Sequence, residues 1–178
     1  MVLSQDATII TVTNTLLNTF LQTGRPVCFT VTTTSMMPLI KPGDQVIVEA
    51  VSQDQWRLGD IALIRLGDAW LVHRLIDRQI KVDKEFWLTK GDNVPSADRL
   101  WSNDELHGIM ILVQKTDCRL DLRLRRIRIA NFALSVISRL ENRVFLSLPH
   151  FFHGVFLKGL RISSYMIVQL VLVRESFS

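Results

Sequence analysis

Short apolar stretches, rich in β-branched and aromatic residues and separated by Gly, Asp and Pro turns, run through most of the first 118 residues. Stretches of this length and composition predict strands, here at residues 27–31, 45–51, 61–66, 70–76, 86–88 and 108–114. Such closely spaced strands favour one bent, partly closed antiparallel sheet. The expected fold class is therefore mainly β, with an N-terminal helix and a helical, basic C-terminal extension.

The N-terminal segment, residues 1–24, is expected to be an amphipathic helix. Asp6 suits its start and Gly24 its end, and four apolar residues share one face: Ile9, Val12, Leu16 and Phe20. Its many Thr, Asn and Gln residues argue against a transmembrane helix. The basic start and apolar core of a cleavable secretory signal peptide are also missing. We therefore expect a cytoplasmic or peripherally membrane-associated protein.

The charge of the chain changes sign at Cys118. Residues 119–178 contain ten basic and three acidic residues, a balance of +7, whereas the preceding residues sum to −3. We therefore expect a β domain over residues 25–118 and a separate, mostly helical extension over residues 119–178.

One side of a helix in this extension is apolar and is flanked by arginines. The apolar residues are Ile129, Phe132, Ala133, Val136, Ile137, Leu140 and Val144. Two interpretations remain open: this side lies in the interface of an anionic membrane, or it packs against the β domain. The later apolar segments, 144–157 and 162–173, are each too short or too interrupted to span a bilayer as one helix.

Ser35 stands where a predicted strand ends, in the sequence TTTSMMPLIKPGD. A serine hydroxyl held there against apolar residues can act as a nucleophile if a base lies nearby. His73 lies in an apolar run with the alternation of a strand, on the face of Leu71 and Leu75, while Arg74 points to the opposite face. Two aspartates follow in a Gly-containing turn, Asp92 and Asp98. Taken together, these residues favour catalysis over separate structural roles.

These segments resemble signal peptidase I and its relatives, serine peptidases of the S24/S26 superfamily. The matching pieces span roughly residues 25–115 and read SMMP with KPGD, RLGDIALIR, LVHRLID, LTKGDNVPSAD and HGIMILV. The histidine at position 73, where most bacterial signal peptidases have lysine, resembles the archaeal and endoplasmic-reticulum type.

The resemblance implies a role for each candidate residue. Ser35 would be the nucleophile, His73 the general base, Asp98 the carboxylate that orients the imidazole, and Asp92 a supporting carboxylate. The backbone N–H of Ser35 and the hydroxyl of Thr33 would form the oxyanion hole. The family usually has glycine where this chain has Thr34, and a β-branched residue restricts the backbone there.

The expected function is cleavage of signal or leader peptides through an acyl-enzyme. The partner would be an extended peptide or preprotein, bound by strand addition at a sheet edge. The alternative is a catalytically weak or inactive peptide-binding module of the same fold at the membrane surface. A self-cleaving repressor is disfavoured because that group uses lysine and no helix-turn-helix precedes the sheet.

No cofactor is expected, because the chain has no glycine-rich phosphate loop and its four histidines do not cluster. Cys28 and Cys118 have no metal-ligand spacing and are expected to be buried thiols. Nucleic acid is an unlikely partner, because the basic run lacks a recognisable binding module.

Overall fold

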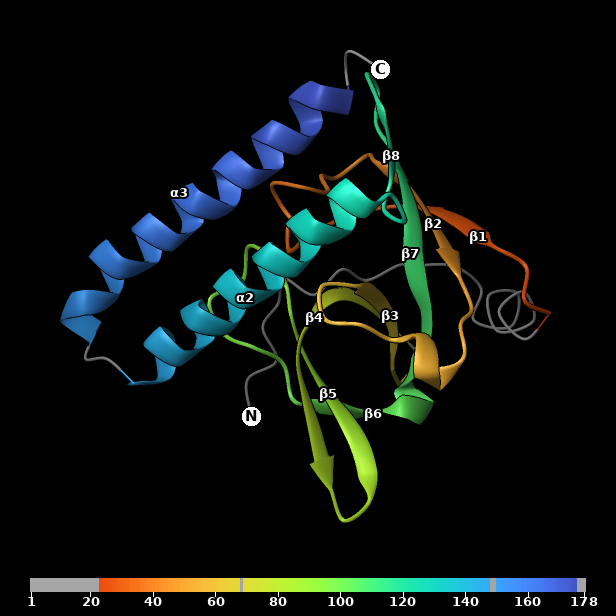
Figure 1. The fold of residues 1–178 in the computed structure, drawn as a ribbon, viewed down its shortest axis with the longest axis horizontal. Helices are drawn as coiled ribbons and strands as arrows, with labels where there is room; N and C mark the ends of the chain where they lie inside the picture. The colour runs from red at the N-terminus through yellow and green to blue at the C-terminus, as the bar shows by residue number, and fades with distance from the viewer. Residues whose placement is uncertain (1–22, 68, 148–149, 176–178) are drawn as a thin grey trace.

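The computed structural model describes residues 23–67, 69–147 and 150–175 of the chain (Figure 1). The predicted N-terminal helix lies almost wholly outside these residues. The described part contains one antiparallel sheet followed by two long helices. The strands are β1 (Val27–Thr30), β2 (Gln45–Glu49), β3 (Ile61–Leu66), β4 (Ala69–Lys81), β5 (Lys84–Lys90), β6 (Leu100–Ser102), β7 (Leu106–Gln114) and β8 (Arg119–Asp121).

The sheet is open and every pairing in it is antiparallel, in the order β1-β2-β7-β3-β4-β5-β6. Strand β7 has β2 along one edge, while its other edge pairs first with β3 and then with β8. The predicted fold class is confirmed: the chain is mainly β, with an antiparallel sheet that is not closed and a helical C-terminal part.

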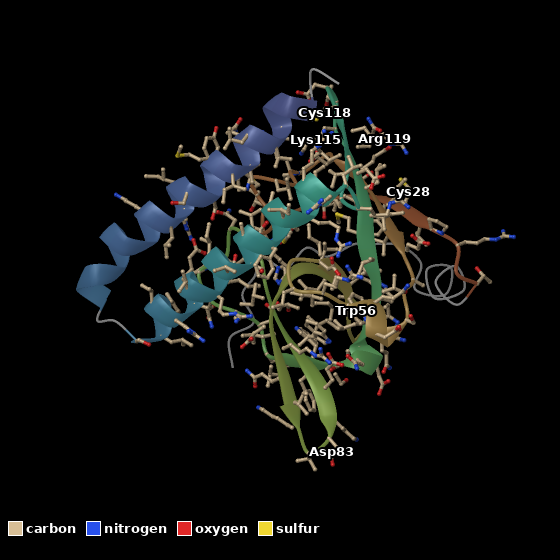
Figure 2. All side chains as sticks on the ribbon, viewed as in Figure 1. Cys28, Trp56, Asp83, Lys115, Cys118 and Arg119 are labelled. Carbon is tan, nitrogen blue, oxygen red and sulfur yellow. The ribbon has the colours of Figure 1, made fainter. Side chains whose placement is uncertain are left out.

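Strand β4 is longer than predicted and forms a hairpin with β5 that extends away from the helices (Figure 1). Val82 and Asp83 make the turn with positive φ angles of 48° and 58°, and Figure 2 shows Asp83 at the tip. The short strands β6 and β8 were not predicted, because three residues are too few to show alternation. Since β8 lies beyond Cys118, the sheet continues into the predicted extension. The division into domains stays a prediction.

The alternation predicted for β4 is visible in the two hydrophobic cores. Trp70 and Val72 belong to one cluster with residues of β1, β2, β7 and both helices. Leu71 and Leu75 belong to the other, which is built around the three tryptophans Trp56, Trp87 and Trp101. The sheet is therefore covered by apolar side chains on both faces, and neighbouring residues of β4 serve different faces.

Two helices complete the described part: α2 (Arg125–Ser147) lies against β4, and α3 (His150–Glu175) packs along α2 (Figure 1). No helix in the described residues is both long and apolar enough to cross a membrane. Cys28 in β1 and Cys118 just before β8 are free thiols (Figure 2); the expectation of burial is wrong for Cys28, which is exposed, and Cys118 is half-buried.

The face of α2 that meets the sheet is not the one that the apolar pattern indicated. Two of its buried residues are aliphatic, Ile127 and Leu134. The other four are polar: Asn131, Ser135, Ser138 and Glu141. Four members of the predicted apolar side are instead exposed, with fractions of 62% for Ile129, 51% for Phe132, 42% for Val136 and 44% for Leu140. The interpretation in which this side packs against the β domain is therefore wrong, because polar contacts hold the opposite face.

Candidate active site

The alternation of β4 and β5 separates two sets of polar side chains. Arg74 lies opposite Lys90 in the strand register, and both side chains make polar contacts with α2. The preceding residues, His73 and Thr89, point to the other face of the sheet, where both bind Asp98. One short stretch of two paired strands thus places the imidazole with its carboxylate partner on one face and the contacts with α2 on the other.

His73 is fixed by a chain of hydrogen bonds that ends in the tryptophan core. Its Nδ1 lies 2.6 Å from Oδ2 of Asp98. The same carboxylate oxygen accepts the Thr89 hydroxyl at 2.6 Å, and the Thr89 oxygen accepts the indole N–H of Trp101 at 2.8 Å. The backbone N–H of Asp98 also donates to the carbonyl of Thr89 at 2.8 Å. Thr89 therefore holds both the side chain and the backbone of Asp98 next to the imidazole.

This arrangement determines which nitrogen of His73 can react. A carboxylate can only accept, so Nδ1 carries the proton and Nε2 of the neutral ring keeps its lone pair. Nε2 is buried and has no hydrogen-bond partner among the described residues. A buried acceptor of this kind is costly to leave unsatisfied, and a catalytic role is one reason for which native proteins keep such an atom.

The backbone of Ser35 is brought near this nitrogen by the turn after β5. The N–H of Asn93 donates to the Ser35 carbonyl at 2.8 Å, and the Asn93 amide donates to the Thr34 carbonyl at 3.3 Å. A Cβ placed on Gly91 would lie 2.8 Å from Nε2 of His73 and 2.9 Å from the Ser35 carbonyl oxygen. His73 and Ser35 therefore border the same small space, and only glycine fits between them.

Both residues are shielded from solvent, with exposed fractions of 1% for Ser35 and 3% for His73. Exclusion of water strengthens electrostatic interactions inside a site. It also means that a bulky ligand reaches Ser35 only when the chain that covers it moves.

Asp92 lies in the same turn but is bound to Arg74. The two carboxylate oxygens accept from Nε and Nη2 of Arg74, both at 2.7 Å. The remaining nitrogen, Nη1, donates to the carbonyl of Gly59 and to Oδ1 of Asn131, both at 2.9 Å. Such a bidentate pair is geometrically specific, so Asp92 anchors the turn that holds Ser35.

The contribution of α2 was not foreseen from the sequence. Besides Asn131, two of its residues reach this region: Glu141 binds Nζ of Lys90 at 2.7 Å, and Asn142 accepts the N–H of Ala97 at 2.9 Å. Lys90 directly precedes Gly91, and Ala97 directly precedes Asp98. The signal available in the sequence was the row of polar residues opposite the apolar side of the helix, which does not reveal their partners.

The candidate residues thus fall into three groups. His73 and Asp98 are in direct contact, and Ser35 adjoins them at Gly91. Asp92 belongs to the supporting ion pair. Thr33 is half-buried two residues before Ser35, and its part in an oxyanion hole stays a prediction.

His107 is separate from this site, with its ring packed edge-on against Trp70 at a centroid distance of 5.1 Å. Burial, and secondarily the charge of Arg65, lowers the pKa of His107.

Because the pKa of His107 is lowered, the unfolded chain binds a proton at this residue more readily than the folded chain. We expect the free energy of unfolding to fall as the pH drops below about 6.5, the usual histidine value, and to level off below the lowered pKa. Urea denaturation between pH 7.5 and 5 should show this loss, and His107→Gln should reduce it.

Comparison with known proteins supports the resemblance to S24 peptidases. A family model described as Peptidase S24-like matches residues 4–94, just over half of the chain. The matched segment contains Ser35 and His73 and ends before Asp98. Searches of curated proteins and of solved structures give no significant match. The closer resemblance to histidine-type signal peptidases stays a prediction. The chain belongs to the Peptidase S24-like family.

Proposed function

We propose that this protein is a serine endopeptidase that cleaves signal or leader peptides through an acyl-enzyme. The observation that carries the proposal is the unpartnered Nε2 of His73. The backbone carbonyl of Ser35 borders the same small space as this nitrogen, while Nδ1 is held by Asp98. A serine, an imidazole and an orienting carboxylate in this relation are the parts that activate a hydroxyl.

Each residue would have one role in the reaction. Nε2 of His73 takes the proton as the Ser35 oxygen attacks the scissile carbonyl, and Asp98 stabilises the imidazolium that forms. The backbone N–H of Ser35 and the hydroxyl of Thr33 would stabilise the oxyanion. The imidazolium then protonates the leaving amine, and a water activated by the same nitrogen hydrolyses the ester.

An extended substrate is supported by the position of β1. This strand is at one end of the sheet order, has β2 as its one partner among the described strands, and leads toward Ser35. A peptide that adds to the free edge of β1 would form main-chain hydrogen bonds and place one carbonyl beside the serine.

The test is to identify both the product and the nucleophile. The protein is incubated with a panel of leader peptides, and the products are identified by mass. In parallel, a fluorophosphonate probe is applied, which esterifies an activated serine, and the labelled peptide is sequenced. We expect cleavage and a label on Ser35. A label on another serine would contradict the assignment.

A non-catalytic peptide-binding module is the second candidate. The near-complete burial of Ser35 and His73 favours it, as does the β-branched Thr34 beside the nucleophile. Leader peptides that bind without being cleaved, together with an unlabelled Ser35, would establish this function instead.

Gly91→Ala is expected to reduce hydrolysis by about 100-fold, because the new Cβ would push His73 and Ser35 apart and small displacements of reacting groups have effects of this size. The matched control is Gly159→Ala in α3, where an added Cβ meets nothing within 4 Å. Rates of peptide cleavage and of probe labelling measure the effect. If Gly91→Ala labels as fast as the Gly159 control, the two side chains do not cooperate across this glycine.

A further inference from the structure

A groove lined with arginines lies on the helix side of the sheet, away from Ser35. It consists of two adjoining cavities of about 280 and 540 Å³. Their shared lining comes from the turn before β3, from the turn after β8 and from the start of α2. The shared residues are Arg57, Asp60, Arg123, Arg128 and Asn131.

The groove carries an excess of positive charge. Arg125 joins the other three arginines in lining the larger cavity, whose one acidic residue is Asp60, and the smaller cavity adds one more carboxylate, that of Glu49. Arg123 is paired with Asp121. Among the described residues, Arg57, Arg125 and Arg128 have no carboxylate within ion-pair distance. Burial raises the pKa of Asp60, and the backbone N–H of Arg57 and the charges of nearby arginines offset part of this rise.

The first turn of α2 adds to this excess. It contains Arg125, Arg126 and Arg128 and no acidic residue. The N-terminal end of a helix carries partial positive charge, so cations there are unfavourable and an anion is favoured. The cavity, its arginines and the helix end therefore all favour the same kind of ligand, an oxyanion that guanidinium groups can bind in a bidentate manner.

The apolar surroundings narrow the choice of ligand. Ile129 and Phe132 line the larger cavity and are exposed. Val136 and Leu140 continue this exposed row along α2. Glu141, the acidic residue of this helix, is buried against Lys90 and does not oppose an anionic surface. A phosphate joined to an acyl chain matches this combination, whereas a free inorganic anion would leave the apolar row unused.

We propose that the groove binds the phosphate of an anionic phospholipid, with the exposed row of α2 resting on the acyl region of the same membrane. The arginines would provide the electrostatic attraction, and the exposed row of α2 would provide the apolar contact, as in other surface-bound amphipathic helices. The groove lies behind the pair of Arg74 and Asp92, since Gly59 and Asn131 line it and both accept from Arg74. The proposal does not depend on peptidase activity.

Co-sedimentation with vesicles tests the charged part of the site. The full chain is mixed with vesicles of phosphatidylcholine alone or with phosphatidylglycerol. We expect binding only to the second kind. The variant Arg57→Gln/Arg128→Gln should bind about 10- to 30-fold more weakly, as expected from two surface cations. The matched control is Lys81→Gln/Lys84→Gln, two exposed lysines at the β4–β5 turn, which loses the same charge and should bind like the wild type.

Two further variants separate the lipid from a free anion. Asp60→Asn removes the acidic residue of the larger cavity and should tighten vesicle binding several-fold. Ile129→Ser/Phe132→Ser should weaken vesicle binding while inorganic phosphate, followed by calorimetry, still binds. Thermal unfolding verifies that each variant is folded. The proposal is overturned if the lysine control loses as much affinity as the arginine variant, or if inorganic phosphate binds and the anionic vesicles do not.

Discussion

Ser35→Ala is expected to abolish cleavage of leader peptides, with a loss of roughly 10⁶-fold in kcat, as found when the nucleophile of a serine peptidase is removed. The reason is that the substitution removes the hydroxyl that would accept the acyl group while Nε2 of His73 takes its proton. Measurement requires purified protein, quantitative mass detection of products and a background rate without protein. Ser163→Ala is the matched control, since Ser163 is an exposed serine of α3 that donates to its own helix. Full activity in Ser35→Ala would end the assignment.

The partners of Ser35 should behave as one unit with it. His73→Ala should lower kcat about as much as Ser35→Ala, and the double variant should be no slower than either alone. Asp98→Asn should cause a smaller but severe loss, roughly 10⁴-fold, because it allows the wrong tautomer of the imidazole. Additive effects of Ser35→Ala and His73→Ala would mean that the two side chains do not act on the same step.

The alternation of side chains along a strand allowed part of the candidate site to be predicted from the sequence. The apolar run around His73 predicted both a strand and the split between His73 and Arg74, and the cores on the two faces of β4 agree with it. Asp98 was chosen through the family resemblance, and in the structure its carboxylate lies at Nδ1 of His73. Local pattern suffices for such features because the period of a strand fixes which side chains share a face.

The role of α2 could not be predicted in this way. Its apolar row indicated a buried side, yet the buried side carries Asn131, Ser135, Ser138 and Glu141. Each of the two longest polar side chains is matched by one partner from β4 or β5, Arg74 for Asn131 and Lys90 for Glu141. These partners are about fifty residues away in the chain, and a helical pattern contains no information on them. Tertiary contacts thus outweighed the amphipathic pattern.

The placement of these contacts links the helix to the site. The strand residues that bind α2 directly adjoin those that make the candidate active site: Arg74 follows His73, and Lys90 precedes Gly91. Asn142 holds the residue before Asp98. The helix therefore restrains the turn between β5 and β6 from the face opposite the imidazole. Loss of a single contact between α2 and the strands should lower the free energy of unfolding and also change the geometry around Ser35.

Glu141→Ala is expected to lower the free energy of unfolding by about 3–5 kcal/mol, the usual cost of removing one partner from a buried ion pair. Lys90 and Glu141 are almost completely buried, with side-chain exposures of 0% and 3%. Without the carboxylate, the Lys90 ammonium would be left charged and desolvated. Urea denaturation at neutral pH measures the change. Glu85→Ala removes a partner from the more exposed pair with Arg78 and should cost no more than about 1 kcal/mol.

Replacing both Lys90 and Glu141 tests separately whether their ion pair stabilises the fold and whether it positions the turn after β5. Lys90→Met/Glu141→Leu removes the charges together and keeps apolar bulk, so it should be as stable as the wild type or more stable. If α2 positions the turn through this ion pair, the double variant should still cleave or label more slowly, because Nζ of Lys90 also donates to the Gly91 carbonyl at 3.3 Å. A double variant that is both stable and fully active would show that the pair serves only to satisfy two buried charges.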